Sequence, residues 1–411
     1  MALLSGYRML DLSRLMAAPY AAHLLADMGM DVIKVEEPEP RYGMPRDSFT
    51  PYLPTPEGER RASAYNPLGR NKRSIALDLL RPELRPRSQE VFYRLAERAD
   101  VVIEGYRPGV LAWMGIDYET LSKINPRIIV CSLSGYGQDG PYVKLAGHAP
   151  QYAGVGGVVR MNEASEPEDG TGVTAGYVNG LFAANAILAA IIERERSGRG
   201  QHVDVSMLGA LMSLSLRDTV LYARDGELPK PRTAEPALTY LKCADGKYVS
   251  TANSESVFWE RFCTLIERPQ YIALRGGNGP EYSAMVEDVR GIFLTKTRDE
   301  WLPLLWAADT AAAPVNSIAE ALDDPQVRHI GMTWELDHPT EGTVLQQGAP
   351  ARFSRTPVEF ERFAPILGEH THEVLTEAGF DAAAIADLEA SGIVKTWTGE
   401  GWVGETRAPG G

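Results

Sequence analysis

Cysteine is scarce in this chain. Its 411 residues include three cysteines, Cys131, Cys243 and Cys263, and no two of them have CxxC spacing. That spacing is what a zinc ribbon or a redox pair would need, and disulfide-stapled secreted domains carry many more cysteines. We therefore expect three buried thiols in a reducing cytoplasm and no metal site.

Several familiar catalytic and targeting signals are also missing. The connection after the first expected strand, Ser13–Pro19, has no G-x-G-x-x-G, and the chain has no P-loop, H-E-x-x-H or G-x-S-x-G. Arg8, Asp11 and Arg14 interrupt the apolar amino-terminal segment, so we expect neither a signal peptide nor a membrane span. A net charge of −14 argues against general nucleic-acid binding.

What is present is an alternation of strand-like and helix-like segments. Strands are expected over 7–12, 31–36, 101–106 and 127–137, and helices over 19–29, 89–100, 181–198 and 206–226. Such alternation predicts an α/β fold with a parallel sheet, whose ligands bind at the carboxyl ends of the strands. A proline-rich break begins at Glu227, and the different texture after it predicts a second, smaller domain over 227–325.

A few polar residues are candidates for chemistry. GRNKRS (Gly69–Ser74) groups three cations, which fits either a solvated loop or a phosphate contact. His148 lies in a turn before a glycine-rich segment and is a candidate acid or base, provided that a second acid is nearby. His370 and His372 are more typical of a solvated helix start than of a metal site.

Several segments together resemble the family III CoA-transferases, the group that includes formyl-CoA transferase, carnitine CoA-transferase and α-methylacyl-CoA racemase. The resemblance runs almost from end to end. It is carried by LDLSRLMAAPYAAHLLADMGMDVIKVE, GRNKRSIALDL, ADVVIEGYRPGVLAWMGIDYETLSKINPRIIVCSLSGYGQDGP, ILAAIIERERSGRGQHVDVSM, APARFSRTP and LGEHTHEVL.

The resemblance implies a Rossmann-like large domain built from the amino-terminal half and the carboxy-terminal segment, a smaller α+β domain, and two chains interlocked as a dimer. The expected boundaries are 1–205 for the first part of the large domain, 206–226 for a linker helix and 227–325 for the small domain. A second linker over 326–350 then returns the chain to the large domain at 351–411.

The resemblance also implies a nucleophile that this chain lacks. The transferases use an aspartate that attacks the acyl-CoA and forms covalent intermediates, which divides one difficult exchange into easier steps. That aspartate corresponds to Gly176, inside TGVTAGYVNG (Thr171–Gly180), which we interpret as a loop without chemistry. Asp169 lies upstream and is interpreted as a surface turn residue.

The CoA site of the family also looks altered. Glu37 and Trp113 stand where the family often has arginines for the nucleotide phosphates, and a carboxylate there would repel a phosphate. Residues that still match and are candidates for contact with CoA are Arg14, Ala17, Arg70, Asn71, Lys72, Arg73 and Lys144.

Three hypotheses follow. The first is a non-catalytic subunit whose homologous partner carries the aspartate, as in the two-subunit succinyl-CoA:(R)-benzylsuccinate CoA-transferase of anaerobic toluene degradation, with a CoA thioester as substrate and no permanently bound cofactor. The second is an active homodimeric 2-methylacyl-CoA racemase or related enzyme that uses His148 with Tyr177 or another acid. The third is a binding or scaffold protein without a catalytic partner.

Overall fold

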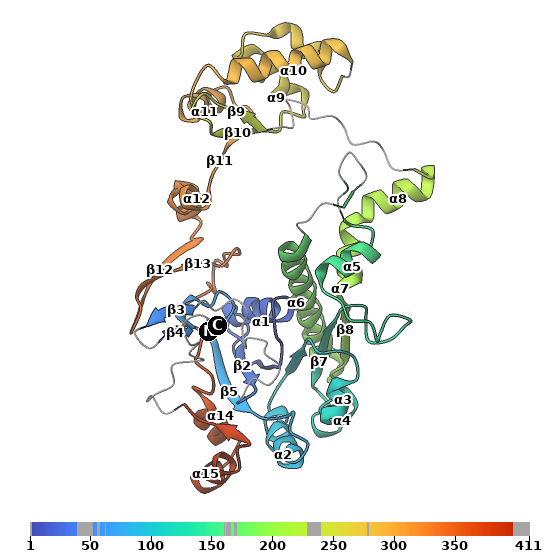
Figure 1. The fold of residues 1–411 in the computed structure, drawn as a ribbon, viewed down its shortest axis with the longest axis vertical. Helices are drawn as coiled ribbons and strands as arrows, with labels where there is room; N and C mark the ends of the chain where they lie inside the picture. The colour runs from blue at the N-terminus through green and yellow to red at the C-terminus, as the bar shows by residue number, and fades with distance from the viewer. Residues whose placement is uncertain are drawn as a thin grey trace. The chain divides into compact units, whose positions relative to one another are not determined.

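The computed structural model describes residues 2–38, 52–55, 58–61, 63–159, 161, 166–167, 171–227, 240–277 and 279–397. The chain divides into two compact units (Figure 1). The larger unit comprises Met1–Val220 together with Gly331–Gly411, and the smaller one is Leu221–Ile330.

A seven-stranded sheet forms the centre of the larger unit. Its strand order is β14-β5-β2-β1-β6-β7-β8, and every neighbouring pair is parallel except β14 with β5. The α/β class with a mainly parallel sheet, predicted from the sequence, is therefore confirmed. The strands are β1 (Arg8–Asp11), β2 (Asp31–Glu36), β5 (Lys72–Leu77), β6 (Val101–Glu104), β7 (Ile129–Ser134), β8 (His202–Ser206) and β14 (Val394–Lys395).

Helices cover both faces of this sheet because alternate strand residues are apolar on each side. Odd-numbered positions such as Met9, Ile103 and Cys131 pack with helices α1 (Ala17–Asp27) and α6 (Thr171–Ser197). On the opposite face, the core includes side chains of helices from both ends of the chain. These helices are α2 (Arg85–Ala96), α3 (Val110–Met114), α4 (Tyr118–Ile124), α14 (Thr371–Glu377) and α15 (Ala382–Ala390).

Helix α6 is the longest helix and lies directly against α1 (Figure 1). By length and composition alone, its residues Thr174–Ser197 could cross a membrane. Its buried residues Ala183, Ile187 and Ile191, however, belong to the same core as β1, β6 and β7. Helix α6 is therefore a central packing element of the larger unit.

The remaining elements of the larger unit are short. They are β3 (Tyr52–Thr55), β4 (Gly58–Arg61), η1 (Ser63–Tyr65), α5 (Ala149–Val155), α7 (Met207–Met212), η2 (Ser213–Ser215), and the antiparallel pair β12 (Thr333–His338) and β13 (Gly342–Gln347). The single helix expected over 206–226 is divided into α7 and α8 (Leu216–Asp225) by η2. Ser206 caps α7, because its side chain accepts a hydrogen bond from the Gly209 amide at 3.2 Å.

The smaller unit has its own aromatic core. Helices α9 (Ser256–Leu265), α10 (Pro280–Phe293) and α11 (Arg298–Ala307) pack with the antiparallel strands β9 (Tyr240–Lys242), β10 (Tyr248–Thr251) and β11 (Ala312–Val315). The rings of Trp259, Phe262, Phe293 and Trp301 stack in succession, with centroids 5.5, 6.0 and 4.6 Å apart. The unit also contains η4 (Pro269–Leu274), α12 (Ile318–Asp323) and α13 (Pro325–His329).

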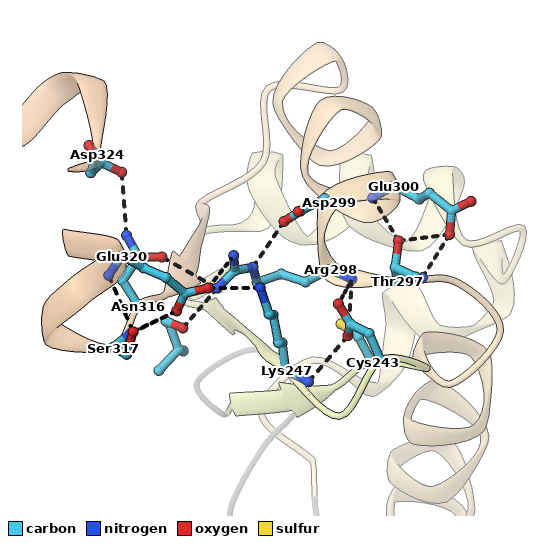
Figure 2. Close-up of polar contacts among 12 residues, drawn as sticks. Cys243, Lys247, Thr297, Arg298, Asp299, Glu300, Asn316, Ser317, Glu320 and Asp324 are labelled. Carbon is cyan, nitrogen blue, oxygen red and sulfur yellow. Dashed lines mark hydrogen bonds and ion pairs between the residues drawn. The ribbon is translucent and has the colours of Figure 1, made fainter. Parts of the chain in front are cut away.

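A buried arginine joins the helical and strand parts of the smaller unit. Figure 2 shows the Arg298 guanidinium between Glu320 and Asp299, to which it forms ion pairs of 3.0 and 3.1 Å. It also donates a hydrogen bond to the carbonyl of Val315 at 3.2 Å, and Lys247 pairs with the same Glu320 at 2.8 Å. These contacts are satisfied within the unit, so this cluster is a structural element.

All three cysteines are free and buried, as predicted from their spacing. Burial, together with the nearby negative charges of Glu104 and Asp204, raises the pKa of the Cys131 thiol to about 12. A thiol with so high a pKa is protonated at neutral pH and is a poor nucleophile. Cys131 is therefore a packing residue.

Candidate functional site

TGVTAGYVNG is not a loop, contrary to our interpretation of the sequence. It forms the first turns of α6, which begins at Thr171, ten residues before the expected start. Its glycines suggested a turn, but the helix is stabilised by packing: Gly176 and Gly180 are buried against the start of α1, and Ala175 packs with Tyr152 and Leu211. Tertiary packing overrides the low helix propensity of glycine here.

Gly176 and Gly180 allow α1 and α6 to approach closely. A Cβ atom at position 176 would lie 2.5 Å from the Met16 Sδ and 2.8 Å from its Cγ. A Cβ at position 180 would lie 2.5 Å from the carbonyl oxygen of Ala17, the first residue of α1. Both distances are well inside van der Waals contact, so an added side chain at position 180 would collide with backbone, and one at position 176 would require the flexible Met16 side chain to move.

The described residues next to Gly176 in α6 carry no carboxylate. Tyr177 is exposed, and its ring meets that of Tyr20 edge-on at 4.8 Å. Burial raises the pKa of Tyr20, and the nearby Tyr177 and Asp27 raise it further, so Tyr20 is a neutral phenol at physiological pH. Asn179 is 1% exposed, and within the described residues its Oδ1 has no hydrogen-bond partner. Asp169 lies outside the described residues.

GRNKRS is neither a solvated loop nor an exposed cationic patch. Arg70 is buried and forms a two-pronged pair with Asp27, with nitrogen–oxygen distances of 3.0 and 2.6 Å. Asn71 donates a hydrogen bond to the same carboxylate at 3.0 Å. The next residue, Lys72, begins β5, so the solvated-loop interpretation is wrong.

Lys72 and Arg73 are directed to carboxylates within the chain. The Lys72 ammonium lies 3.1 Å from Asp11, and both residues are almost completely buried. Arg73 pairs with Asp31 at 2.6 Å and with two glutamates of α14, Glu373 at 2.7 Å and Glu377 at 2.8 Å. These pairs explain why the cations are buried, and contact with CoA stays a prediction for them.

The first strand connection also carries an internal ion pair. Arg14 pairs with Glu37, and its guanidinium lies over the Tyr106 ring, 5.5 Å from the centroid. The charge of Glu37 is thus opposed by Arg14, one of the cations that we considered for CoA. Lys144 is exposed and sits in the segment before His148.

Trp113 is covered by an arginine from another helix. The Arg85 guanidinium of α2 lies 3.7 Å from the centroid of the Trp113 ring, and Nη1 donates a hydrogen bond to the Trp113 carbonyl at 3.3 Å. Gln89 and Tyr93, further along α2, donate to the next two carbonyls, of Met114 and Gly115. A stripe of α2 side chains therefore caps the carboxyl end of α3.

His148 lies at the amino-terminal end of α5 and is exposed. Its backbone amide donates a hydrogen bond to the Gln151 side chain at 2.9 Å. In the described part of the chain, no ion pair links His148 to a carboxylate. His370 likewise precedes a helix, α14, as predicted, and its Nδ1 accepts a hydrogen bond from the Ser74 amide at 3.3 Å.

Glu104, which the sequence analysis did not single out, is a buried acid at the carboxyl end of β6. Burial raises its pKa to about 7, and the negative Asp204 contributes, although hydrogen bonds from Ser132 and the Tyr106 amide oppose the shift. The Tyr106 amide donates to it at 2.6 Å, and the Ser132 Oγ lies 3.0 Å from the His202 Nε2. The sequence could have pointed to Glu104 through its position as the last residue of the strand-like segment VVIE (Val101–Glu104).

We predict that replacing Glu104 by glutamine stabilises the protein at alkaline pH. Because the pKa of Glu104 in the folded protein is above the ordinary value of 4.5, the folded protein keeps this carboxyl protonated between pH 4.5 and pH 7, where the unfolded chain loses the proton. The contribution of this group to stability is complete below pH 4.5 and is lost as the pH rises through 7. Glu104→Gln should therefore raise the free energy of unfolding by about 3 kcal/mol at pH 8 and leave it nearly unchanged at pH 4.5.

Urea unfolding at the two pH values measures this difference, with Glu97→Gln at the exposed C-cap of α2 as the matched control. The control should behave like the wild type at both pH values. Equal stability of the Glu104→Gln and wild-type proteins at pH 8 would show that the buried carboxyl does not carry the proton.

Comparisons with known proteins identify the class of protein. The model of CoA-transferase family III matches residues 4–371. The succinate–glutarate CoA-transferase of Agrobacterium fabrum is 36% identical over 91% of this chain and 95% of its own length. The β subunit of the succinyl-CoA–L-malate CoA-transferase of Chloroflexus aurantiacus is 32% identical over 95% of this chain and 98% of its own length.

A solved structure agrees with these relatives. The crystal structure of a CaiB/BaiF family protein from Brucella suis has a TM-score of 0.76 and 30% sequence identity, over 91% of this chain and 99% of that one. The chain therefore belongs to CoA-transferase family III, as its sequence motifs predicted.

Proposed function

We propose that this chain is the non-catalytic subunit of a heteromeric family III CoA-transferase. The observation that carries the proposal is Gly176, which stands at the position where the family resemblance implies the aspartate nucleophile. Glycine has no side chain that could supply the carboxylate, and the position is buried against Met16. A homologous partner chain would supply the aspartate.

The proposed reaction explains why this loss is decisive. In a family III transferase, the aspartate attacks the thioester carbonyl and releases the CoA thiolate, which then attacks the aspartyl carbonyl of the mixed anhydride, forms an enzyme-bound CoA thioester and releases the donor acid. The acceptor carboxylate displaces the thiolate from that thioester to form a second mixed anhydride, and the thiolate then attacks the acceptor acyl carbon, which releases the new CoA thioester and restores the aspartate. Every intermediate is bound to the same carboxyl group, so a glycine at this position removes the whole covalent route.

For the donor, we infer succinyl-CoA. The similar proteins from A. fabrum and C. aurantiacus are named as CoA-transferases of succinate with glutarate and of succinyl-CoA with L-malate. Both acceptors are dicarboxylic acids, and benzylsuccinate, which the sequence analysis favoured, belongs to the same chemical class. We propose a dicarboxylate acceptor, with CoA thioesters as substrates and no permanently bound cofactor.

We propose that the chain works in a soluble, cytoplasmic complex in which it interlocks with a homologous partner chain. Helix α6 exposes large apolar side chains at Leu181, Phe182 and Ile192, and α8 exposes Leu216 and Val220. Exposed apolar side chains of this number favour a partner surface. One relative is itself named as a β subunit. Within such a complex, our candidates for contact with CoA are Arg14, Ala17, Arg70, Asn71, Lys72, Arg73 and Lys144.

Co-expression tests the proposal. A tagged form of this chain is expected to co-purify with a homologue encoded beside its gene, and the complex should transfer CoA from succinyl-CoA to a dicarboxylate. Replacing the partner's nucleophilic aspartate by asparagine should abolish transfer, because this chain cannot substitute for it. Transfer that survives this change would contradict the proposal.

The same preparation distinguishes the racemase alternative. Exchange of the α-proton of a 2-methylacyl-CoA in deuterated water, lost in His148→Ala, would favour a homodimeric enzyme that uses His148. The proposed subunit should exchange no α-proton.

A further inference from the structure

Three polar side chains are connected across the sheet of the larger unit, near the carboxyl ends of β6 and β7. Glu104 ends β6 and lies opposite Ser132 in the parallel pair of β6 and β7. The Ser132 hydroxyl is hydrogen-bonded to Glu104, and its Oγ also lies 3.0 Å from the Nε2 atom of His202 on β8. Ser132 therefore links a buried acid to a histidine on the neighbouring strand.

These three residues lead from the interior of the unit to its surface. Glu104 and Ser132 are each 3% exposed, whereas His202 lies on β8, the edge strand of the sheet, and is exposed. The Tyr118 ring of α4 stacks on the His202 ring, with centroids 6.1 Å apart and planes 15° apart, which holds the imidazole beside Ser132. A proton on Glu104 thus has a connected path to solvent through two hydrogen bonds.

The surroundings of Glu104 make its own proton decisive. Strand β1 and helices α2, α3 and α4 contribute apolar side chains to the core of this face of the sheet. In the described part of the chain, Asp204 of β8 is the charged side chain that raises the pKa of Glu104, in addition to burial. Burial also raises the pKa values of the Cys131 thiol and the Tyr106 phenol, so both are neutral near pH 7.

The number of hydrogen atoms fixes the direction of both hydrogen bonds. A hydroxyl has one hydrogen to donate, so Ser132 can donate to Glu104 or to His202, but not to both. When Glu104 carries its proton, it donates to the Ser132 Oγ, and the hydroxyl donates to Nε2. When Glu104 is ionised it can only accept, so the hydroxyl donates to it and Nε2 becomes the donor to Oγ.

We propose that Glu104, Ser132 and His202 form a pH-sensitive switch in which loss of the Glu104 proton reverses both hydrogen bonds and moves the His202 ring proton from Nδ1 to Nε2. The Glu104 O–H bond breaks as an O–H bond forms at Ser132, the former Ser132 proton passes to Nε2, and the Nδ1 proton leaves to water. One proton is lost in total, and the negative charge stays on Glu104.

The consequence at the surface is a change in what His202 offers to a ligand or partner. Below the transition the Nδ1 atom of the exposed ring is a hydrogen-bond donor, and above it the same atom is an acceptor. The ionisation of a buried acid is thereby transmitted to the edge strand of the sheet. The switch needs no nucleophile at position 176, so it is independent of the proposed function.

Nitrogen NMR of the full chain, labelled with ¹⁵N on its histidine rings, tests the switch, because protonated and unprotonated ring nitrogens give different signals. The His202 signals are assigned by their loss in His202→Gln. Between about pH 6 and pH 8, the neutral His202 ring of the wild type should change from the Nδ1–H to the Nε2–H form, with a midpoint near pH 7. The exposed His372 of α14 is the internal reference and should show no such exchange of tautomers.

Two variants separate the switch from an ordinary histidine titration. Glu104→Gln removes the titrating group, and Ser132→Ala removes the link, so both should abolish the change in the ratio of the two neutral forms. Glu104→Gln should also be at least as stable as the wild type at these pH values, so its result does not depend on whether Ser132→Ala folds. Ser134→Ala is the matched control, because Ser134 is an equally buried serine of β7 that accepts a hydrogen bond from the Gly137 amide at 3.1 Å.

Ser134→Ala should keep the wild-type transition of His202. A change of tautomer that persists in Glu104→Gln or in folded Ser132→Ala would overturn the switch. So would a wild-type ring that is protonated on both nitrogens at about pH 6 and passes directly to the Nε2–H form, because such a ring titrates on its own.

Discussion

With succinyl-CoA and glutarate, the purified chain is expected to transfer CoA on the order of 10⁴ to 10⁶ times more slowly than an enzyme with its nucleophile in place. The reason is chemical, because the covalent route needs a carboxylate and position 176 is a glycine packed under Met16. Residual transfer would come from binding and orientation alone. Those contributions survive the loss of a nucleophile but leave the exchange a single difficult step.

The succinate–glutarate CoA-transferase of A. fabrum, assayed at the same enzyme and substrate concentrations, is the appropriate reference. Formation of glutaryl-CoA measures transfer in both proteins. A rate for the purified chain within tenfold of the reference would mean that another residue acts as the nucleophile. The account of Gly176 would then be wrong.

Replacing Lys72 by methionine is expected to destabilise the protein by about 3 to 5 kcal/mol. Lys72 is 1% exposed and Asp11 is 0% exposed, so the substitution leaves a carboxylate inside the protein without its buried partner. Burial by itself raises the pKa of Asp11, but Lys34, Lys72 and hydrogen bonds from Ser13 together hold it below its usual value. The Lys72 ammonium also donates to the Pro19 carbonyl at 3.2 Å and so ties β5 to α1.

Urea denaturation followed by circular dichroism measures this loss. Lys123→Met on the exposed side of α4 is the matched control and should change stability by less than about 0.5 kcal/mol. The double variant Lys72→Met with Asp11→Asn should recover part of the loss, because the orphaned charge is removed. A Lys72→Met protein as stable as the control would mean that the buried pair contributes little.

Much of the sheet could be predicted because the local sequence pattern of these strands is typical of strands. DVIKVE (Asp31–Glu36) is β2 as the sequence indicated, and the strands expected near Leu10, Val102 and Val130 are β1, β6 and β7. Alternating strands and helices then dictate a parallel sheet. The first turns of α6 were missed because glycines at 176 and 180 lower helix propensity, whereas the close approach of α1 that requires them is a tertiary feature.

The polar part of the candidate site was less predictable. Arg73 is 300 residues from Glu373 in sequence, so its burial between strand and helix had no local signal. The sequence indicated that the three cations of GRNKRS could be exposed, because charged residues are rarely buried without partners. Their partners could not be recognised because they are distant in sequence. The assignment of the nucleophile to position 176 counts along one helix and depends on no distant contact, and it stays a prediction.

The intact masses of this chain and of a co-purified homologous partner, measured after brief incubation with succinyl-CoA, show which of the two chains carries the nucleophile. We predict that this chain keeps its unmodified mass, and that the partner alone gains the mass of a succinyl group or of CoA. A CoA thioester or an acyl adduct on this chain would contradict it.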